Sequence, residues 1–96
     1  MAALDYSERA LADVDRLSEF LIAEFPAEAL GTASLIMDAI EILRRHPLIG
    51  RPAENGLREL VISRGRSGYV ALYLYDEPKD RIVIHAIRHQ RQAGYP

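Results

Sequence analysis

The fold of this chain is decided by residues 57–91, LRELVISRGRSGYVALYLYDEPKDRIVIHAIRHQR, which contain three strand-like runs. The middle run alternates with period two, giving one face with Tyr69, Ala71, Tyr73 and Tyr75 and another with Val70, Leu72 and Leu74. The predicted strands span residues 57–63, 69–76 and 81–88, with turns at 64–68 and 77–80. Short connections between successive strands predict an antiparallel meander.

The residues before this meander have helical spacing. Ser7 is a good N-cap for an amphipathic helix over residues 8–24, and Pro26 ends that helix near Phe25. A second helix over residues 27–45 has a wide apolar surface and is stopped by Pro47, with a loop continuing to Gly56. Residues 2–6 are expected to form a short edge strand.

These elements predict a single α+β domain over residues 1–96, in the order β-α-α-β-β-β. The helix hairpin packs on one face of a small antiparallel sheet. Both faces of the middle strand are apolar or aromatic, and the hairpin can cover only one of them. We therefore expect the isolated protein to associate or aggregate and to become soluble with a partner.

The charge of the chain is divided between its two halves. Residues 1–43 contain nine acidic side chains and two arginines, a net charge of −7, whereas residues 44–96 contain ten basic and five acidic side chains, a net charge of +5. Lys79 is the only lysine among the twelve cations. Arginine binds carboxylates and phosphates in a bidentate way, so this bias favours an interaction surface, although a high-GC genome would also favour arginine.

Composition excludes several classes of function. The chain has no cysteine, no apolar run long enough to span a membrane and no signal-peptide pattern at Met1, so we expect a cytoplasmic protein. His85 and His89 lie four apart on an extended segment, about 13 Å between Cα atoms, which argues against a shared metal ion. No cofactor is expected. A chain of 96 residues has little room for a deep substrate cavity, so function is expected on the surface.

A set of arginine, tyrosine and histidine residues remains on or beside the predicted sheet. Its members are Arg58, Arg64, Arg66, Tyr69, Tyr73, Tyr75, Arg88, His89, Arg91 and Tyr95. A basic, aromatic surface of this kind can bind an acidic peptide, or RNA through phosphate contacts and base stacking.

Five local patterns in this order resemble the ParE/RelE toxin superfamily of bacterial type II toxin–antitoxin modules. They are Ser7-Glu8-Arg9-Ala10 with Asp13, the loop His46-Pro47-Leu48-Ile49-Gly50-Arg51-Pro52, the strand Leu57-Arg58-Glu59-Leu60, the strand Tyr69-Val70-Ala71-Leu72-Tyr73, and the ending His89-Gln90-Arg91-Gln92. The ending resembles the ParE branch in particular. Together the patterns cover nearly the whole chain.

The resemblance implies a toxin neutralised by a cognate ParD-like antitoxin, and the branch decides the mechanism. ParE-like members poison DNA gyrase, whereas RelE-like members are ribosome-dependent mRNA endonucleases. Here Val70 stands where the strand motif carries Arg, and Lys79 lies in a turn, so the lysine-rich strand of the nucleases has no counterpart. Gyrase inhibition by binding, without catalytic residues, is therefore the leading interpretation. The alternatives are a RelE-like endonuclease, or a degenerate binding module without toxicity.

The resemblance and the charge pattern suggest two sets of contact residues. The target-binding set is Arg64, His89, Arg91 and Tyr95, and the antitoxin-binding set is Leu35, Ile42, Arg58, Tyr73 and Arg88. We expect the antitoxin segment to be acidic and amphipathic, with its apolar side chains against the open sheet face and the helix flank. No metal-binding residue is assigned.

Overall fold

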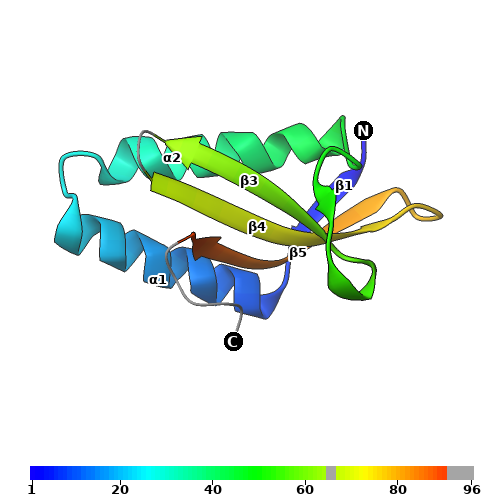
Figure 1. Ribbon diagram of the computed structural model, residues 1–96, viewed down its shortest axis with the longest axis horizontal. Helices are drawn as coiled ribbons and strands as arrows, with labels where there is room; N and C mark the ends of the chain where they lie inside the picture. The colour runs from blue at the N-terminus through cyan, green and yellow to red at the C-terminus, as the bar shows by residue number, and fades with distance from the viewer. Residues whose placement is uncertain (65–66, 91–96) are drawn as a thin grey trace.

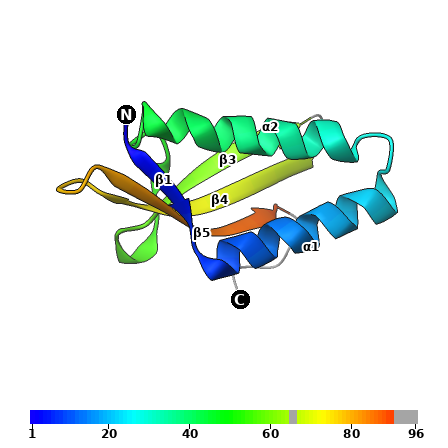
Figure 2. The same cartoon turned by 180° about the vertical axis from the view of Figure 1, so that it is seen from behind.

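A helix hairpin covers one face of a five-stranded sheet (Figures 1 and 2). The computed structural model describes residues 1–64 and 67–90. The elements are β1 (Ala3–Tyr6), α1 (Glu8–Glu24), α2 (Ala29–Glu41), a 3-10 turn η1 (Ile42–Arg44), β2 (Arg51–Pro52), a 3-10 turn η2 (Glu54–Gly56), β3 (Arg58–Arg64), β4 (Ser67–Asp76) and β5 (Arg81–His89). The α+β class and the helix hairpin on the sheet are as predicted.

The strand order is β1-β5-β4-β3-β2, with the predicted meander of β3, β4 and β5 at its centre. The pairs β2–β3, β3–β4 and β4–β5 are antiparallel. The exception is β1, which pairs with β5 in parallel from Ala3 opposite Arg81 to Tyr6 opposite Ile84. The first strand of the chain therefore joins the last one at the edge of the sheet, where the sequence predicted an edge strand without specifying its partner or direction. The local pattern of residues 2–6 contains no information on this long-range pairing.

The two helices begin and end close to the predicted positions. The first helix has the predicted bounds, and the side chain of Ser7 caps it by accepting a hydrogen bond from the Ala10 amide at 3.0 Å. The α2 helix is shorter than predicted, because its last turn tightens into η1 before the chain turns at Pro47. Among the described residues, no helix is long and apolar enough to cross a membrane.

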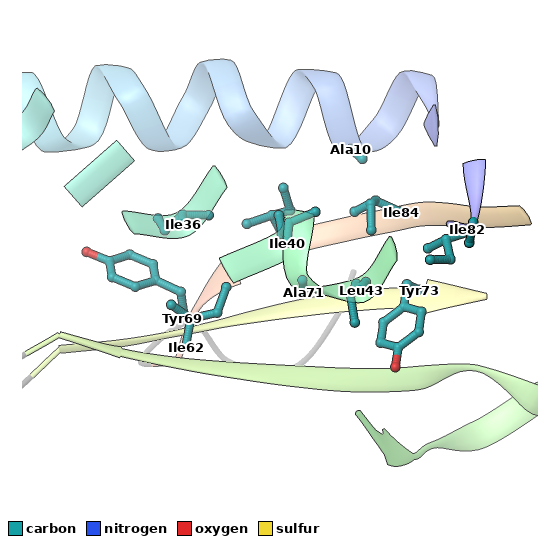
Figure 3. Packing of buried hydrophobic residues seen from close by; sticks show 12 residues of the cluster. Ala10, Ile36, Ile40, Leu43, Ile62, Tyr69, Ala71, Tyr73, Ile82 and Ile84 are labelled. Atoms are coloured by element: carbon teal, nitrogen blue, oxygen red, sulfur yellow. The ribbon is translucent and has the colours of Figure 1, made fainter. Parts of the chain in front are cut away.

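The core lies between the helix hairpin and the sheet (Figure 3). The predicted alternation along β4 is confirmed, since Tyr69, Ala71 and Tyr73 all point into this core. They meet Ile36 and Ile40 from α2, at the layer where the helices lie over the sheet. Burial of such side chains contributes about 25 cal/mol per Å² of apolar surface removed from water, which makes this layer the main source of stability.

The apolar residues spaced along the first helix differ in their burial. Val14, Leu17 and Leu21 pack against the core or are buried, whereas Leu11 and Ile22 are more than half exposed. Part of the buried face of α1 is instead formed by Ala10 and by the carboxylate of Asp13.

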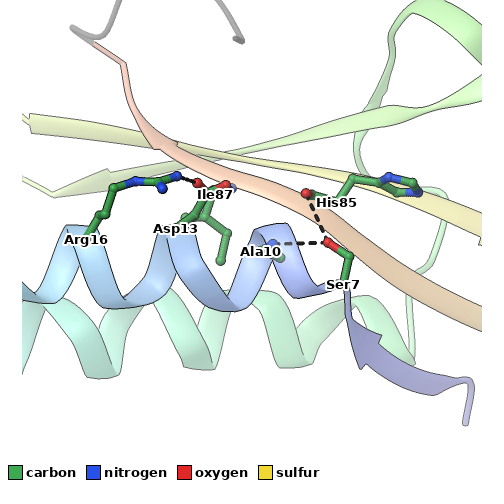
Figure 4. A network of polar contacts seen from close by, with 6 residues as sticks. All are labelled: Ser7, Ala10, Asp13, Arg16, His85 and Ile87. Carbon is green, nitrogen blue, oxygen red and sulfur yellow. Dashed lines mark hydrogen bonds and ion pairs between the residues drawn. The ribbon is translucent and has the colours of Figure 1, made fainter.

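Polar side chains of α1 and of its N-cap form hydrogen bonds with the edge of β5 beyond the end of β1 (Figure 4). Parallel pairing with β1 stops at Ile84, and there the Ser7 hydroxyl donates a hydrogen bond to the His85 carbonyl at 3.2 Å. Asp13 is only 4% exposed and accepts a hydrogen bond from the Ile87 amide at 3.0 Å. Its other oxygen is paired with Arg16. Two helix side chains thus replace the missing strand, as buried backbone groups require.

Candidate interaction surfaces

The loop between α2 and β3 is held in place by a buried tyrosine. The Tyr73 hydroxyl donates a hydrogen bond to the Pro47 carbonyl at 2.7 Å and accepts one from the Gly50 amide at 2.9 Å. A Cβ atom added to Gly50 would lie 2.6 Å from the Tyr73 hydroxyl oxygen and 2.8 Å from the Glu59 carbonyl oxygen. Glycine is therefore required here, because the loop backbone passes directly against the tyrosine.

The guanidinium of Arg58 holds the same loop from its other side. It donates hydrogen bonds to the Gly50 carbonyl at 2.7 Å and to the Leu48 carbonyl at 3.3 Å. The loop also contains β2, where Arg51 pairs with Glu59 and Pro52 with Arg58 in an antiparallel register. The predicted loop over residues 47–56 thus contains an ordered edge strand, formed through contacts with β3 and β4.

The same loop exposes two large aliphatic side chains. Leu48 is 57% exposed and Ile49 is 58% exposed, although the backbone on either side of them is fixed by hydrogen bonds. They line an open cleft of about 530 Å³, together with His46, Pro47, Tyr75 and Glu77. Exposed aliphatic pairs beside an apolar cleft are typical of surfaces that bind another protein.

Burial and one hydrogen bond set the acidity of the tyrosines near this cleft. Burial raises the pKa of the Tyr73 phenol above its ordinary value. A hydrogen bond from the Tyr75 hydroxyl to Asp80, 2.8 Å long, raises the pKa of the Tyr75 phenol. Both phenols therefore stay protonated at neutral pH and act as hydrogen-bond donors.

The sheet face away from the helices is apolar at its centre. Val70 lies directly opposite Val61 of β3 on one side and Arg88 of β5 on the other. Val70 and Arg88 are buried, whereas Val61 is exposed. The position where the toxin strand motif carries Arg therefore has an aliphatic neighbour on one strand and a cation on the other.

The predicted target-binding residues are only partly described by the structure. His89 ends β5, with its ring 5.2 Å from that of Tyr69 and 6.2 Å from that of Phe20, both edge-on. Arg64 ends β3, with its backbone opposite Ser67. Arg91 and Tyr95 lie outside the described residues.

The structure separates the five residues predicted to contact the antitoxin. Tyr73 is fully buried on the helix-facing side of the sheet, so its expected location on the open sheet face is wrong. The same pleat that places Tyr69 and Ala71 in the core also places Tyr73 there. Arg58 holds the loop, and Leu35 packs against the core. Arg88 is buried, and Ile42 is half exposed at the end of α2.

Two residues with clear structural roles were not assigned to a site by the sequence interpretation. Asp13 and Gly50 both occur in the quoted family patterns, and each contacts a residue far away in the sequence. Asp13 could have been noticed in the sequence because it is an acidic residue on the apolar side of the first helix. Among residues 1–64 and 67–90, no group of three potential metal ligands comes together.

Comparisons with known proteins identify relatives that match nearly the whole chain. Residues 4–94 match the family described as ParE toxin of type II toxin–antitoxin system, parDE. Toxin RelE3 of Caulobacter vibrioides is 34% identical over 90 residues, covering 93% of this chain and 95% of that protein.

Solved structures of toxin–antitoxin proteins have the same fold. A chain of the chromosomal ParDE system from P. aeruginosa superimposes with a TM-score of 0.75 at 25% identity, covering 92% of this chain and 95% of that one. A chain of the intact E. coli RelBE toxin–antitoxin complex superimposes with a TM-score of 0.69 at 15% identity, covering 99% of this chain and 100% of that one.

Proposed function

We propose that this chain, which belongs to the ParE toxin family of type II toxin–antitoxin systems, inhibits DNA gyrase by binding it and is neutralised by a cognate antitoxin. Membership of the family makes the chain the toxin component of such a system. The identity of the target and the mode of neutralisation are the proposal.

The apolar centre of the sheet is the observation that supports gyrase binding over RNA cleavage. Val70 replaces the strand arginine and has Val61 beside it on β3. Cleavage of a phosphodiester needs donors or cations placed against the charge that develops on the phosphate. Lys79 is in the turn between β4 and β5, at the far end of these strands. An aliphatic side chain at position 70 cannot stabilise such a charge, so a binding mechanism fits this sheet better.

One observation favours the alternative, a RelE-like ribosome-dependent mRNA endonuclease. Arg88 lies directly opposite Val70 in the register of β4 and β5. In that case the Arg88 guanidinium, from the neighbouring strand, would stabilise the charge on the phosphate in place of the arginine that is missing at position 70. Its burial argues for a role inside the fold instead.

Expression of the chain in a bacterium separates these mechanisms. We expect growth arrest with a DNA-damage response and intact mRNA, and purified gyrase should lose supercoiling activity when the protein is added. Replacement of the predicted target contact Arg91 by Ala should reduce toxicity without changing mRNA fragment patterns. Replacement of Arg9, an exposed arginine near the start of α1, provides a matched control that should remain toxic.

Two other results would contradict gyrase inhibition. Ribosome-dependent cleavage of mRNA by the purified wild-type protein would overturn the gyrase proposal and establish the endonuclease. A folded protein that causes no growth arrest, no gyrase inhibition and no RNA cleavage would instead be a degenerate binding module.

Neutralisation is proposed to occur through an acidic, amphipathic antitoxin segment. Similar folds are found in solved toxin–antitoxin assemblies, which supports a protein partner of this kind. Residues 44–96 have a net charge of +5, which favours an acidic partner and faster association. Co-expression with the antitoxin encoded beside the toxin gene should restore growth and yield a stable complex. Unchanged growth arrest would contradict the proposal.

A further inference from the structure

We infer that the antitoxin docks on the end of α2 and the loop that follows it, an inference that rests on the proposed neutralisation by an acidic antitoxin. We call this area the anchor surface. It consists of Ile42, Arg45, His46, Leu48 and Ile49, beside the cleft of about 530 Å³. This assignment keeps Ile42 from the set predicted by the sequence and moves the rest of the contact from the open sheet face to the loop.

The residues of the anchor surface lie on successive backbone turns that hydrogen bonds join to one another. The His46 amide donates a hydrogen bond to the Ile42 carbonyl at 3.1 Å, and the Ile49 amide donates one to the His46 carbonyl at 3.1 Å. Ile42 is half exposed and Ile49 more than half, so apolar surface extends from the end of α2 into the loop.

The fold holds this surface rigid from behind. Tyr73 and Arg58 together bind three carbonyls and one amide of residues 47–50, yet neither covers the side chains of Leu48 and Ile49. A loop whose backbone is already ordered loses little conformational entropy when a partner binds its side chains. Ordered, exposed aliphatic residues of this kind provide anchors for a protein interface.

Charge distinguishes the antitoxin from other occupants. The side chains of Arg45 and His46 are exposed and form no hydrogen bond or ion pair within the described part of the chain, whereas Arg44 is paired with Glu41 at 2.6 Å. An acidic, amphipathic segment supplies carboxylates to Arg45 and apolar side chains to the cleft. Glu77 lies on the cleft wall and repels the carboxylates of the segment. The less acidic part of the segment is therefore expected to lie beside Glu77. A second copy of this chain would bring a second Arg45 to the same surface, which like-charge repulsion disfavours.

The test measures the affinity of the purified toxin for the antitoxin encoded beside it. Leu48→Glu and Ile49→Glu should each weaken binding about 30-fold, mainly through faster dissociation, because each removes an apolar anchor and repels an acidic partner. Leu30→Glu is the matched control, since Leu30 is 83% exposed at the other end of α2. It should bind as the wild type does. Circular dichroism verifies that all three variants remain folded.

A second substitution examines the charge contribution separately. Arg45→Glu should lower the association rate and reduce its dependence on salt, because the exposed cation acts mainly at long range. Glu28→Arg, at the start of α2, should leave the salt dependence of association nearly unchanged.

Each outcome has a distinct meaning. If Leu48→Glu, Ile49→Glu and Arg45→Glu all bind like wild type, the anchor surface is not the antitoxin site. Loss of toxicity in Leu48→Glu with unchanged antitoxin affinity would assign the surface to the cellular target and overturn the inference. Failure of the wild-type toxin to bind the antitoxin would refute the proposed neutralisation itself, and with it the inference.

Discussion

The loop at residues 47–50 and the end of β5 at residues 85–87 both contain backbone groups that need hydrogen-bond partners, and different elements provide those partners. In both, backbone groups without a β-strand partner bind side chains from a distant element. At β5 the donors and acceptors come from α1 and its cap, and Asp13 is almost completely buried. At the loop they come from β3 and β4, and the loop's own aliphatic side chains remain in water. Similar hydrogen bonding therefore closes the core at one place and presents an interaction surface at the other.

The largest expected effect is a substitution that pushes the loop away from its tyrosine. Gly50→Ala should lower the free energy of unfolding by about 3 kcal/mol, because its Cβ would overlap the Tyr73 hydroxyl and the Glu59 carbonyl. Gly56→Ala is the comparison, since Gly56 has a φ of +75° but a Cβ added there would meet no atom within 4 Å. It should cost about 1 kcal/mol from backbone strain alone. Urea denaturation measures both, and equal costs would contradict the close approach at Gly50.

The β5 edge should respond to the loss of its helix acceptor. Asp13→Ala leaves the buried Ile87 amide without its carboxylate and should cost about 2 kcal/mol of stability. Asp13→Asn keeps a carbonyl oxygen at the same position and should recover about half of that loss. Hydrogen exchange at the Ile87 amide distinguishes a local effect from a global one. Unchanged protection in Asp13→Ala would show that the helix acceptor is not needed.

The tyrosine behind the loop should give a smaller, pH-dependent effect. Tyr73→Phe removes the two hydroxyl hydrogen bonds and should cost about 1 kcal/mol at neutral pH. The pKa of Tyr73 is raised in the folded state, so its contribution is fully present below the ordinary value of 10.0 and is lost as the pH rises through the raised pKa. Thermal unfolding between about pH 9 and 12 should therefore decline less steeply in Tyr73→Phe than in wild type. Identical slopes would mean that this phenol does not contribute to alkaline unfolding.

The smallest effect is expected on the exposed side of the same loop. Leu48→Ser should change the free energy of unfolding by less than about 0.5 kcal/mol, since Leu48 is more than half exposed. Leu43→Ser, in the buried part of η1, should cost several times more. A large loss of stability in Leu48→Ser would indicate that the loop side chains support the fold, and would remove the contrast between the two regions.

Local patterns were sufficient to predict most of the secondary structure. The Ser7 cap, the apolar spacing of α1 and Pro26 defined the first helix, and the alternation of β4 separated its two faces, although it did not reveal that the tyrosine face is the one that enters the core. These signals depend on neighbours in the chain, so they can be read without tertiary information. The two-residue strand β2 was missed, because its pairing with β3 is created by the hydrogen bonds that fix the loop.

The candidate site was harder to predict than the fold. Arg58 and Tyr73 were assigned to the antitoxin contact, and in the structure both hold the loop. A basic or aromatic residue on a strand does not reveal whether it faces a partner or holds a loop. The remaining site assignments, including Arg91 and Tyr95 beyond the described residues, stay predictions.

The sequence by itself determined the α+β class, the helix hairpin, the meander and the toxin family, because periodicity and ordered motifs are local properties of the chain. Only the tertiary structure decided that β1 joins β5, that Asp13 caps the strand edge and that Tyr73 fixes a loop with exposed aliphatic residues. The Tyr73 contact with Pro47 joins residues 26 positions apart, and the Asp13 contact with Ile87 joins residues 74 positions apart. Their existence depends on how the packed elements bring distant backbone groups together, which no local pattern encodes.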